Sequence, residues 1–156
     1  MIILKLPFYK LRRGIHNIIR YIPVIWDDED FSYEPLYKLM YYKLKFMEDF
    51  HRSRYTWAAN SDETADEIRI AKVLAKRLWQ DDYLTNATIE YDKKWKNEKL
   101  FNFVPKNNGK RYRLEHRNEE QHKDFSKASK HSDYMENQDR EYLFDYICKR
   151  VRNWWD

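Results

Sequence analysis

The sequence contains very little glycine: Gly14 and Gly109 are the only two. Phosphate-binding loops and dinucleotide-binding turns need several glycines close together, where the backbone approaches the ligand. The sequence also has a single cysteine, Cys148, which excludes an internal disulfide framework and the usual cysteine-based zinc sites. We expect this thiol to be buried, because it follows Ile147 in a helical pattern. These shortages disfavour an enzyme of any glycine-rich nucleotide-binding class.

Long apolar runs are missing as well. The opening MIILKLPFYKLRR is apolar at first, but charge interrupts it too soon for a signal peptide or a membrane span. We therefore expect no integral membrane association and a location in the cytoplasm. Lysine and arginine outnumber the acidic residues by 30 to 26, so the net charge of +4 does not by itself indicate nucleic acid as a partner.

The spacing of histidines and acids gives no recognisable catalytic or metal motif. Five histidines are present, but no pair has the HExxH spacing of a helical zinc site, so we expect no metal and no cofactor. Asp81 and Asp82 lie at the predicted end of a helix, where the dipole opposes negative charge, and an arginine partner is expected. An unrecognised enzyme with such an acidic site is a third functional hypothesis.

The length and composition favour one domain made mainly of helices. A chain of 156 residues suits a single core, and 42% hydrophobic residues with two glycines and four prolines favour helices over disorder. We predict a single domain over 1–156, a bundle of three or four main helices with one short β-hairpin. The predicted elements are a short basic amphipathic helix at 11–22, core helices at 33–52, 62–82 and 133–155, a hairpin at 99–116, and a polar linker or exposed helix at 117–131.

Helix limits follow from capping residues and proline. Pro23 is predicted to end the first helix, Ser32 to cap the second, and Ser132 with Asp133 to start the last. Each core helix carries an apolar stripe at spacings of three and four. The stripes are Leu36, Leu39, Met40, Leu44, Met47 and Phe50; Ile68, Ile70, Ala71, Val73, Leu74, Ala75 and Leu78; and Leu143, Ile147, Val151 and Trp154.

The hairpin is predicted from two short runs, LFNFVP and RYRLEH, that flank the turn-forming KNNGK. Phe101 and Phe103 alternate along one arm, and Tyr112 and Leu114 along the other. This alternation predicts that each arm turns one face inward.

Two groups of basic and aromatic residues make nucleic acid a possible partner. The first is the N-terminal segment with Lys10, Arg12, Arg13 and Arg20, and the second is Arg111, Tyr112 and Arg113 after the hairpin turn. Cations contact phosphate, and aromatic rings stack on unpaired bases. The N-terminal pattern also allows an interfacial helix, because apolar residues recur at helical spacing among these cations.

Aromatic residues make up 17% of the chain, a share that suits both a core and a protein partner. Trp154 and Trp155 point about 100° apart in one helix, so one of them is available as an anchor for a partner unless a wide groove buries both.

Several strings resemble a family of uncharacterised proteins of tailed bacteriophages and prophages. They are RGIHNIIRYIPVIWDDEDFSYEPLYKLMYYKL, which contains IPVIWDDEDFSY, then RLWQDDY, FNFVP and the final WWD. The resemblance covers residues 13–156 and departs from the family's pattern in the polar stretch at 117–130. It implies a phage gene product made in the bacterial cytoplasm and brings no activity with it.

The sequence leads to three functional hypotheses. The first is a non-enzymatic, phage-encoded interaction protein, a host-directed regulator or anti-defence factor that binds a host or phage protein. The alternative is a nucleic-acid-binding accessory protein that uses its basic and aromatic N-terminal arm, and the third is the enzyme with an acidic site. The sequence leaves the oligomeric state open.

Overall fold

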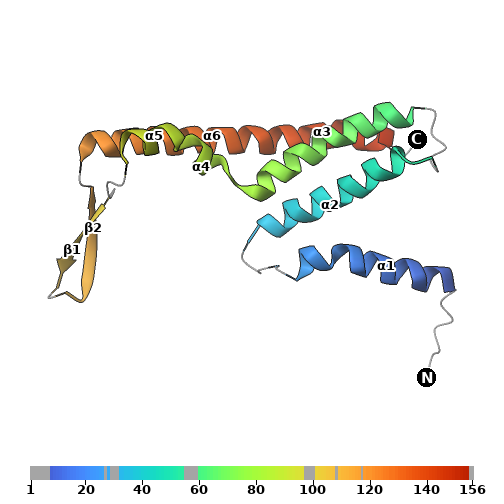
Figure 1. Cartoon of the computed structure of the whole chain (residues 1–156), viewed down its shortest axis with the longest axis horizontal. Helices are drawn as coiled ribbons and strands as arrows, with labels where there is room; N and C mark the ends of the chain where they lie inside the picture. Colours follow the sequence, from blue (N-terminus) through green and yellow to red (C-terminus); the bar gives the residue numbers. More distant parts are fainter. Residues whose placement is uncertain are drawn as a thin grey trace, which may run out of the picture. The chain divides into compact units, whose positions relative to one another are not determined.

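The computed structural model describes residues 8–26, 28, 32–54, 60–96, 101–107, 109–116 and 118–154. These residues form six α-helices, one 3-10 helix and a two-stranded antiparallel sheet. In chain order the elements are α1 (Phe8–Ile25), α2 (Glu34–His51), α3 (Ser61–Gln80), α4 (Tyr83–Ala87), α5 (Ile89–Lys94), β1 (Phe101–Lys106), β2 (Arg111–His116), α6 (Glu119–Arg150) and the 3-10 helix η1 (Val151–Trp154) (Figure 1). The predicted fold class, mainly helical with one hairpin, is confirmed.

The chain divides into two compact units. Unit 1 comprises Met1–Gln80 and Leu143–Asp156, and unit 2 comprises Asp81–Tyr142. Helix α6 therefore contributes residues to both units. The single domain over 1–156 stays a prediction, because compact units of this kind also occur within one domain.

The core of unit 1 lies between α2 and α3, which run side by side (Figure 1). The predicted stripe of α3 is confirmed in part, because Ile68, Ala71, Leu74, Ala75 and Leu78 are all buried. The alanines allow the two helices to approach closely. The other two residues of the stripe, Ile70 and Val73, are exposed. The buried side of α3 is thus narrower than the apolar stripe in its sequence.

The predicted stripe of α2 is also only partly buried. Leu44 is buried, but Leu36, Leu39 and Phe50 are exposed. The buried side of α2 is instead formed by Tyr37, Leu44, Glu48 and His51. Two of these four side chains are polar, so a search for apolar periodicity places the inward face at the wrong angle. The prediction that Ser32 caps this helix was wrong, because the N-cap is Tyr33 and no side chain makes a capping hydrogen bond there. Ser32 precedes the cap, and its Oγ accepts a 3.2 Å hydrogen bond from the Glu34 N–H.

The first helix is longer than predicted and continues through Pro23. A proline inside a helix removes one hydrogen bond and crowds the carbonyl four residues earlier. Here it lies in the last turn, and the ladder resumes beyond it, with the Trp26 N–H donating to the Ile22 carbonyl at 2.9 Å. The prediction that Pro23 ends the helix was therefore wrong.

The last helix starts earlier than predicted. Asn118 Oδ1 accepts a 2.9 Å hydrogen bond from the Glu120 N–H, and Glu119 and Glu120 occupy the first turn. Residues 119–131 of the predicted polar linker or exposed helix are therefore helical and form the beginning of α6, and Ser132 and Asp133 lie within the helix. The predicted start at Ser132 was wrong because Asn118 already satisfies the helix N-terminus.

The C-terminal part of α6 follows its predicted stripe. Leu143 and Trp154 are buried, and Ile147 and Val151 are half-buried. The prediction of a buried thiol was wrong, because Cys148 is exposed. Its position is one residue, or about 100° around the helix, from Ile147.

The predicted hairpin is confirmed, with Phe103 opposite Leu114 and Pro105 opposite Tyr112. The turn needs left-handed backbone, which Asn107 at φ 53° and Gly109 at φ 83° provide. The prediction of an inward face was wrong, because Phe103, Tyr112 and Leu114 are exposed. The hairpin is therefore held by its turn, by its backbone pairing and by the edge-on contact of Phe103 with Tyr112, whose ring centres lie 6.5 Å apart.

Unit 2 also contains α4 and α5, which the sequence did not predict as separate helices. They contact α6 through side chains: the Tyr83 hydroxyl donates to Asp139 Oδ2 at 2.6 Å, and the Tyr91 ring packs edge-on against Phe125. Both helices are shorter than seven residues, which is too short for an apolar period to be visible in sequence.

Candidate binding surfaces

An apolar groove of about 330 Å³ lies in unit 1, between α2 and the C-terminal end of α6 with η1. Every residue that lines it is apolar except for one lysine. The lining residues are Leu39, Met40, Lys43, Leu44, Met47, Ile147, Val151 and Trp154. Most belong to stripes that the sequence placed in the core. Leu44 and Trp154 are buried as expected, whereas Leu39, Met40, Met47, Ile147 and Val151 remain at least partly accessible. We call this surface the α2 groove.

The floor of the α2 groove is fixed by hydrogen bonds to Trp154, which is only 2% exposed. Its indole N–H donates to Glu67 Oε2 at 3.1 Å, and its carbonyl oxygen lies 3.2 Å from His51 Nε2. Glu67 also accepts a 2.8 Å hydrogen bond from Arg150. The groove is thus built on a tryptophan held from α2 and α3, a preformed surface.

The two tryptophans predicted as partner anchors have different outcomes. Trp154 is a core residue of unit 1 and forms part of the floor of the α2 groove. Trp155 lies outside the described residues.

A cluster of charges lies beside the core of unit 1. Glu48 is buried and accepts a 3.3 Å hydrogen bond from Arg52, and it forms an ion pair with Lys72 of α3. Arg52 also donates to Asp66 at 2.7 Å. Burial raises the pKa of Glu48, but the hydrogen bonds from Lys72 and Arg52 outweigh burial and hold this pKa below its ordinary value. The cluster joins α2 to α3 and keeps Glu48 charged.

The predicted basic residues of the N-terminal arm are all exposed on α1. They are Lys10, Arg12, Arg13 and Arg20. The Arg20 guanidinium lies 4.5 Å from the centre of the Phe46 ring on α2, a cation–π contact.

The hairpin residues Arg111, Tyr112 and Arg113 are exposed as well, and Arg113 Nε lies 3.5 Å from Glu115. They belong to unit 2 and the arm belongs to unit 1, so the two basic groups are separate candidate surfaces. A nucleic-acid interface on either group stays a prediction.

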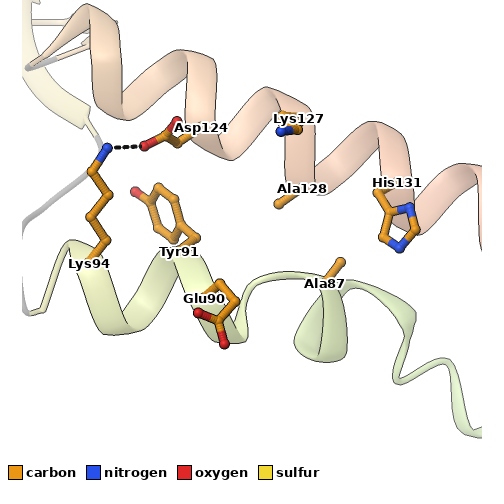
Figure 2. Close-up of a pocket in the computed structure, with 8 residues that line it drawn as sticks. All are labelled: Ala87, Glu90, Tyr91, Lys94, Asp124, Lys127, Ala128 and His131. Carbon is orange, nitrogen blue, oxygen red and sulfur yellow. Dashed lines mark hydrogen bonds and ion pairs between the residues drawn. The ribbon is translucent and has the colours of Figure 1, made fainter.

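A polar cleft of about 390 Å³ lies in unit 2, between α4, α5 and α6. Figure 2 shows Lys94 reaching from α5 to Asp124 on α6, with Tyr91 beside them and Lys127 and His131 further along α6. Lys94 Nζ lies 2.7 Å from Asp124 and 2.8 Å from Glu120, and the Trp95 indole donates to Asp124 at 3.1 Å.

These contacts pair the charged groups Lys94 and Asp124 that line the cleft. Lys94, followed by Trp95, lowers the pKa of Asp124, and Asp124, followed by Glu120, raises the pKa of Lys94. Each group is thus held in its charged form by its partners, and proton transfer at neutral pH would require breaking that pairing. The arrangement joins α5 to α6.

The acidic pair that the sequence suggested as a candidate enzyme site follows the end of α3. Asp81, at φ 48°, and Asp82 are both exposed in the turn before α4. Within the described ranges, neither carboxylate has an ion pair, and the expected arginine partner is not found. The same ranges contain no group of three histidine, cysteine or acidic residues that could hold a metal ion. No helix among the described residues is long and apolar enough to cross a membrane.

Comparisons with protein-family models, with curated proteins and with solved structures gave no match.

Proposed function

We propose that the chain is a non-enzymatic interaction protein that binds a partner protein in the α2 groove. The observation that carries this proposal is the groove itself, an accessible apolar surface on a preformed floor. Interfaces concentrate their binding energy in such desolvated apolar centres. No residue in its lining is a nucleophile or an acid, and Lys43 is the one charged group. This composition suits binding better than catalysis.

The occupant that fits is the apolar stripe of an amphipathic helix of the partner. Helix-binding grooves accept apolar side chains spaced three and four apart, and methionines such as Met40 and Met47 adapt to their shapes. The resemblance to tailed-phage proteins supports a bacterial host protein as the partner, in the cytoplasm, and a host-directed regulatory or anti-defence role.

The exposed Cys148 provides the test. A photoactivatable benzophenone attached to this single thiol lies one residue from Ile147 of the groove. After irradiation in extract of the bacterial host, the wild-type protein should cross-link to a defined host protein. Leu39→Glu places a charge in the groove at an exposed position, and we expect it to reduce capture by about tenfold or more.

The matched control is Val73→Glu, an exposed apolar residue of α3 in the same unit and outside the groove. It should capture the partner as the wild type does. Circular dichroism checks that both variants are folded. Equal capture by Leu39→Glu and the wild type, or no cross-linked protein, would contradict the proposal.

A further inference from the structure

Helix α1 has one wholly apolar side, and that side is exposed. At 100° per residue its apolar positions fall within an arc of roughly 120°. Its members are Phe8, Leu11, Ile15, Ile18, Ile19, Ile22 and Ile25, with Trp26 directly after the helix. Each is at least 45% exposed. This is a continuous apolar face along the whole helix, which we call the α1 face.

The opposite side of α1 packs on α2. Val24 is only 4% exposed, the Tyr21 ring lies 5.7 Å from Phe46, and Arg20 lies over the same ring. A surface helix of a globular protein normally turns its apolar stripe to the core and its charges to water. Here the helix packs on α2 through its polar side. The described residues of unit 1 therefore leave the α1 face uncovered.

The charge of α1 indicates what covers this face. Lys10, Arg12, Arg13 and Arg20 are exposed, and the helix contains no aspartate or glutamate. On the helical wheel, Arg12 borders the α1 face directly, and the other cations lie further round. A helix with an aliphatic side and a purely cationic polar side is complementary to a surface with hydrocarbon below and negative charge above.

We propose that α1 binds the surface of an anionic lipid bilayer, lying along it with the α1 face in the hydrocarbon boundary. Arg12, which borders the α1 face, and Lys10, which lies beyond its other edge, would meet the phosphate and carboxylate headgroups, to which basic residues are attracted within a Debye length. Arg20 lies over Phe46, on the side of α1 that packs on α2. Trp26, at one end of the face, suits the headgroup level, where indole rings concentrate. This binding is peripheral and is independent of the α2 groove.

Two other occupants fit the same surface less well. A second copy packed through the α1 face would place Arg12 of each helix beside the seam, and neither helix carries an acid to pair with it. Nucleic acid would satisfy the cations but would leave the isoleucines in water, because an aliphatic side chain has no ring on which a base stacks. A bilayer satisfies both sides of the helix.

Vesicle flotation with the full chain tests the proposal. The wild type should float with vesicles of phosphatidylcholine containing about one third phosphatidylserine, and much less with phosphatidylcholine alone. The double variant Ile15→Gln with Ile18→Gln removes part of the α1 face without changing charge or packing on α2. We expect its partition coefficient to fall by about tenfold or more, from the area lost to the hydrocarbon.

Three further variants separate the apolar contribution, the electrostatic contribution and the α2 groove. Ile70→Gln, the same replacement at an exposed position of α3, should bind as the wild type does. Lys10→Gln with Arg12→Gln should lose most of the dependence on phosphatidylserine. Leu39→Glu should still float, so a failure of the α2 groove proposal is distinguishable from a failure of this one.

Several results would overturn the membrane proposal. One is equal flotation of the wild type and the Ile15/Ile18 variant. Another is failure of the wild-type protein to float with either kind of vesicle. Salt-sensitive binding to a single-stranded oligonucleotide, unchanged in the Ile15/Ile18 variant and able to displace the vesicles, would assign α1 to nucleic acid instead. A dimer in sedimentation that this variant abolishes would assign the α1 face to a second copy.

Discussion

Each unit is stabilised internally by a different kind of contact. Unit 1 buries a set of apolar side chains, among them Ile68, Leu78 and Leu143, each no more than 2% exposed. In the described part of unit 2, Tyr83 is the one buried side chain in the apolar class, and Gln121, Ser132 and Asp139 are buried beside α6. Unit 1 thus has an apolar core, whereas unit 2 depends on hydrogen bonds and ion pairs along one helix.

Because of this difference, salt, pH and substitutions should affect the stability of the two units differently. Apolar burial is insensitive to salt and pH, while polar contacts depend on partners, charge state and geometry. Exposed pairs such as Lys94 with Asp124 contribute little each. We therefore expect unit 2 to open more readily than unit 1, and the following changes test this comparison.

The largest effect should come from Ile68→Ala in the core of unit 1. Ile68 is fully buried on α3, and an isoleucine-to-alanine change at such a site costs about 2 to 5 kcal/mol through lost burial and the cavity left behind. Urea unfolding followed by circular dichroism measures the loss. The matched control is Ile18→Ala on the exposed α1 face, for which the expected change is within about 0.5 kcal/mol. Equal losses in the two variants would mean that α1 is buried in solution.

The next effect should come from Tyr83→Phe in unit 2. The variant keeps the ring and removes the hydroxyl that donates to buried Asp139 at 2.6 Å. A hydrogen bond to a charged acceptor contributes about 1.5 to 3 kcal/mol. Hydrogen exchange should show lower protection for the amides around residues 130–142, with α3 unchanged. An equal loss of protection in α3 would show that the units do not open separately.

The sequence predicted features that depend on local pattern. The four longer helices, the hairpin and its turn were found because apolar spacing and the KNNGK turn signal act over a few residues. The capping serines did not mark the helix starts correctly, and the short helices α4 and α5 were missed. The start of α6 was missed because Asn118 and Ser132 are both acceptable caps, and only the structure shows which one accepts the backbone hydrogen bond. Pro23 was read as a stop because its effect depends on how many helical bonds follow it.

The candidate surfaces depend on long-range packing, and the sequence predicted them less well. The α2 stripe was identified, but the buried side of α2 includes Glu48, which is paired with Arg52 and with Lys72 of another helix. Sequence showed an amphipathic α1 and could not tell that its polar side packs on α2. The pair between Lys94 and Asp124 joins residues far apart in the chain, and no local signal indicates it.

A third change, Glu48→Gln, tests the charged part of unit 1. Because the pKa of Glu48 in the folded protein lies below its ordinary value of 4.5, ionised Glu48 stabilises the fold at pH above that value. This contribution is lost as the pH falls through the lowered pKa. We expect Glu48→Gln to cost about 1 to 2 kcal/mol at pH 7, from weakened hydrogen bonds to charged groups, and less in acid. Urea unfolding at both pH values checks this, and a difference that grows in acid would contradict it.

The smallest effect should come from Gly109→Ala in the hairpin of unit 2. Space is not the limit, because no atom lies within 4 Å of the added Cβ, but the φ of 83° is unfavourable for any residue with a Cβ. The expected cost is about 1 kcal/mol. Since the aromatic side chains of the hairpin are exposed, this strain should stay local and lower the protection of the β1 and β2 amides in hydrogen exchange. Gly14→Ala is the control, because Gly14 lies inside α1 with open space around it, and alanine there favours the helix. A global loss of stability in Gly109→Ala would show that the hairpin contributes to the folding of unit 2, contrary to its exposed faces.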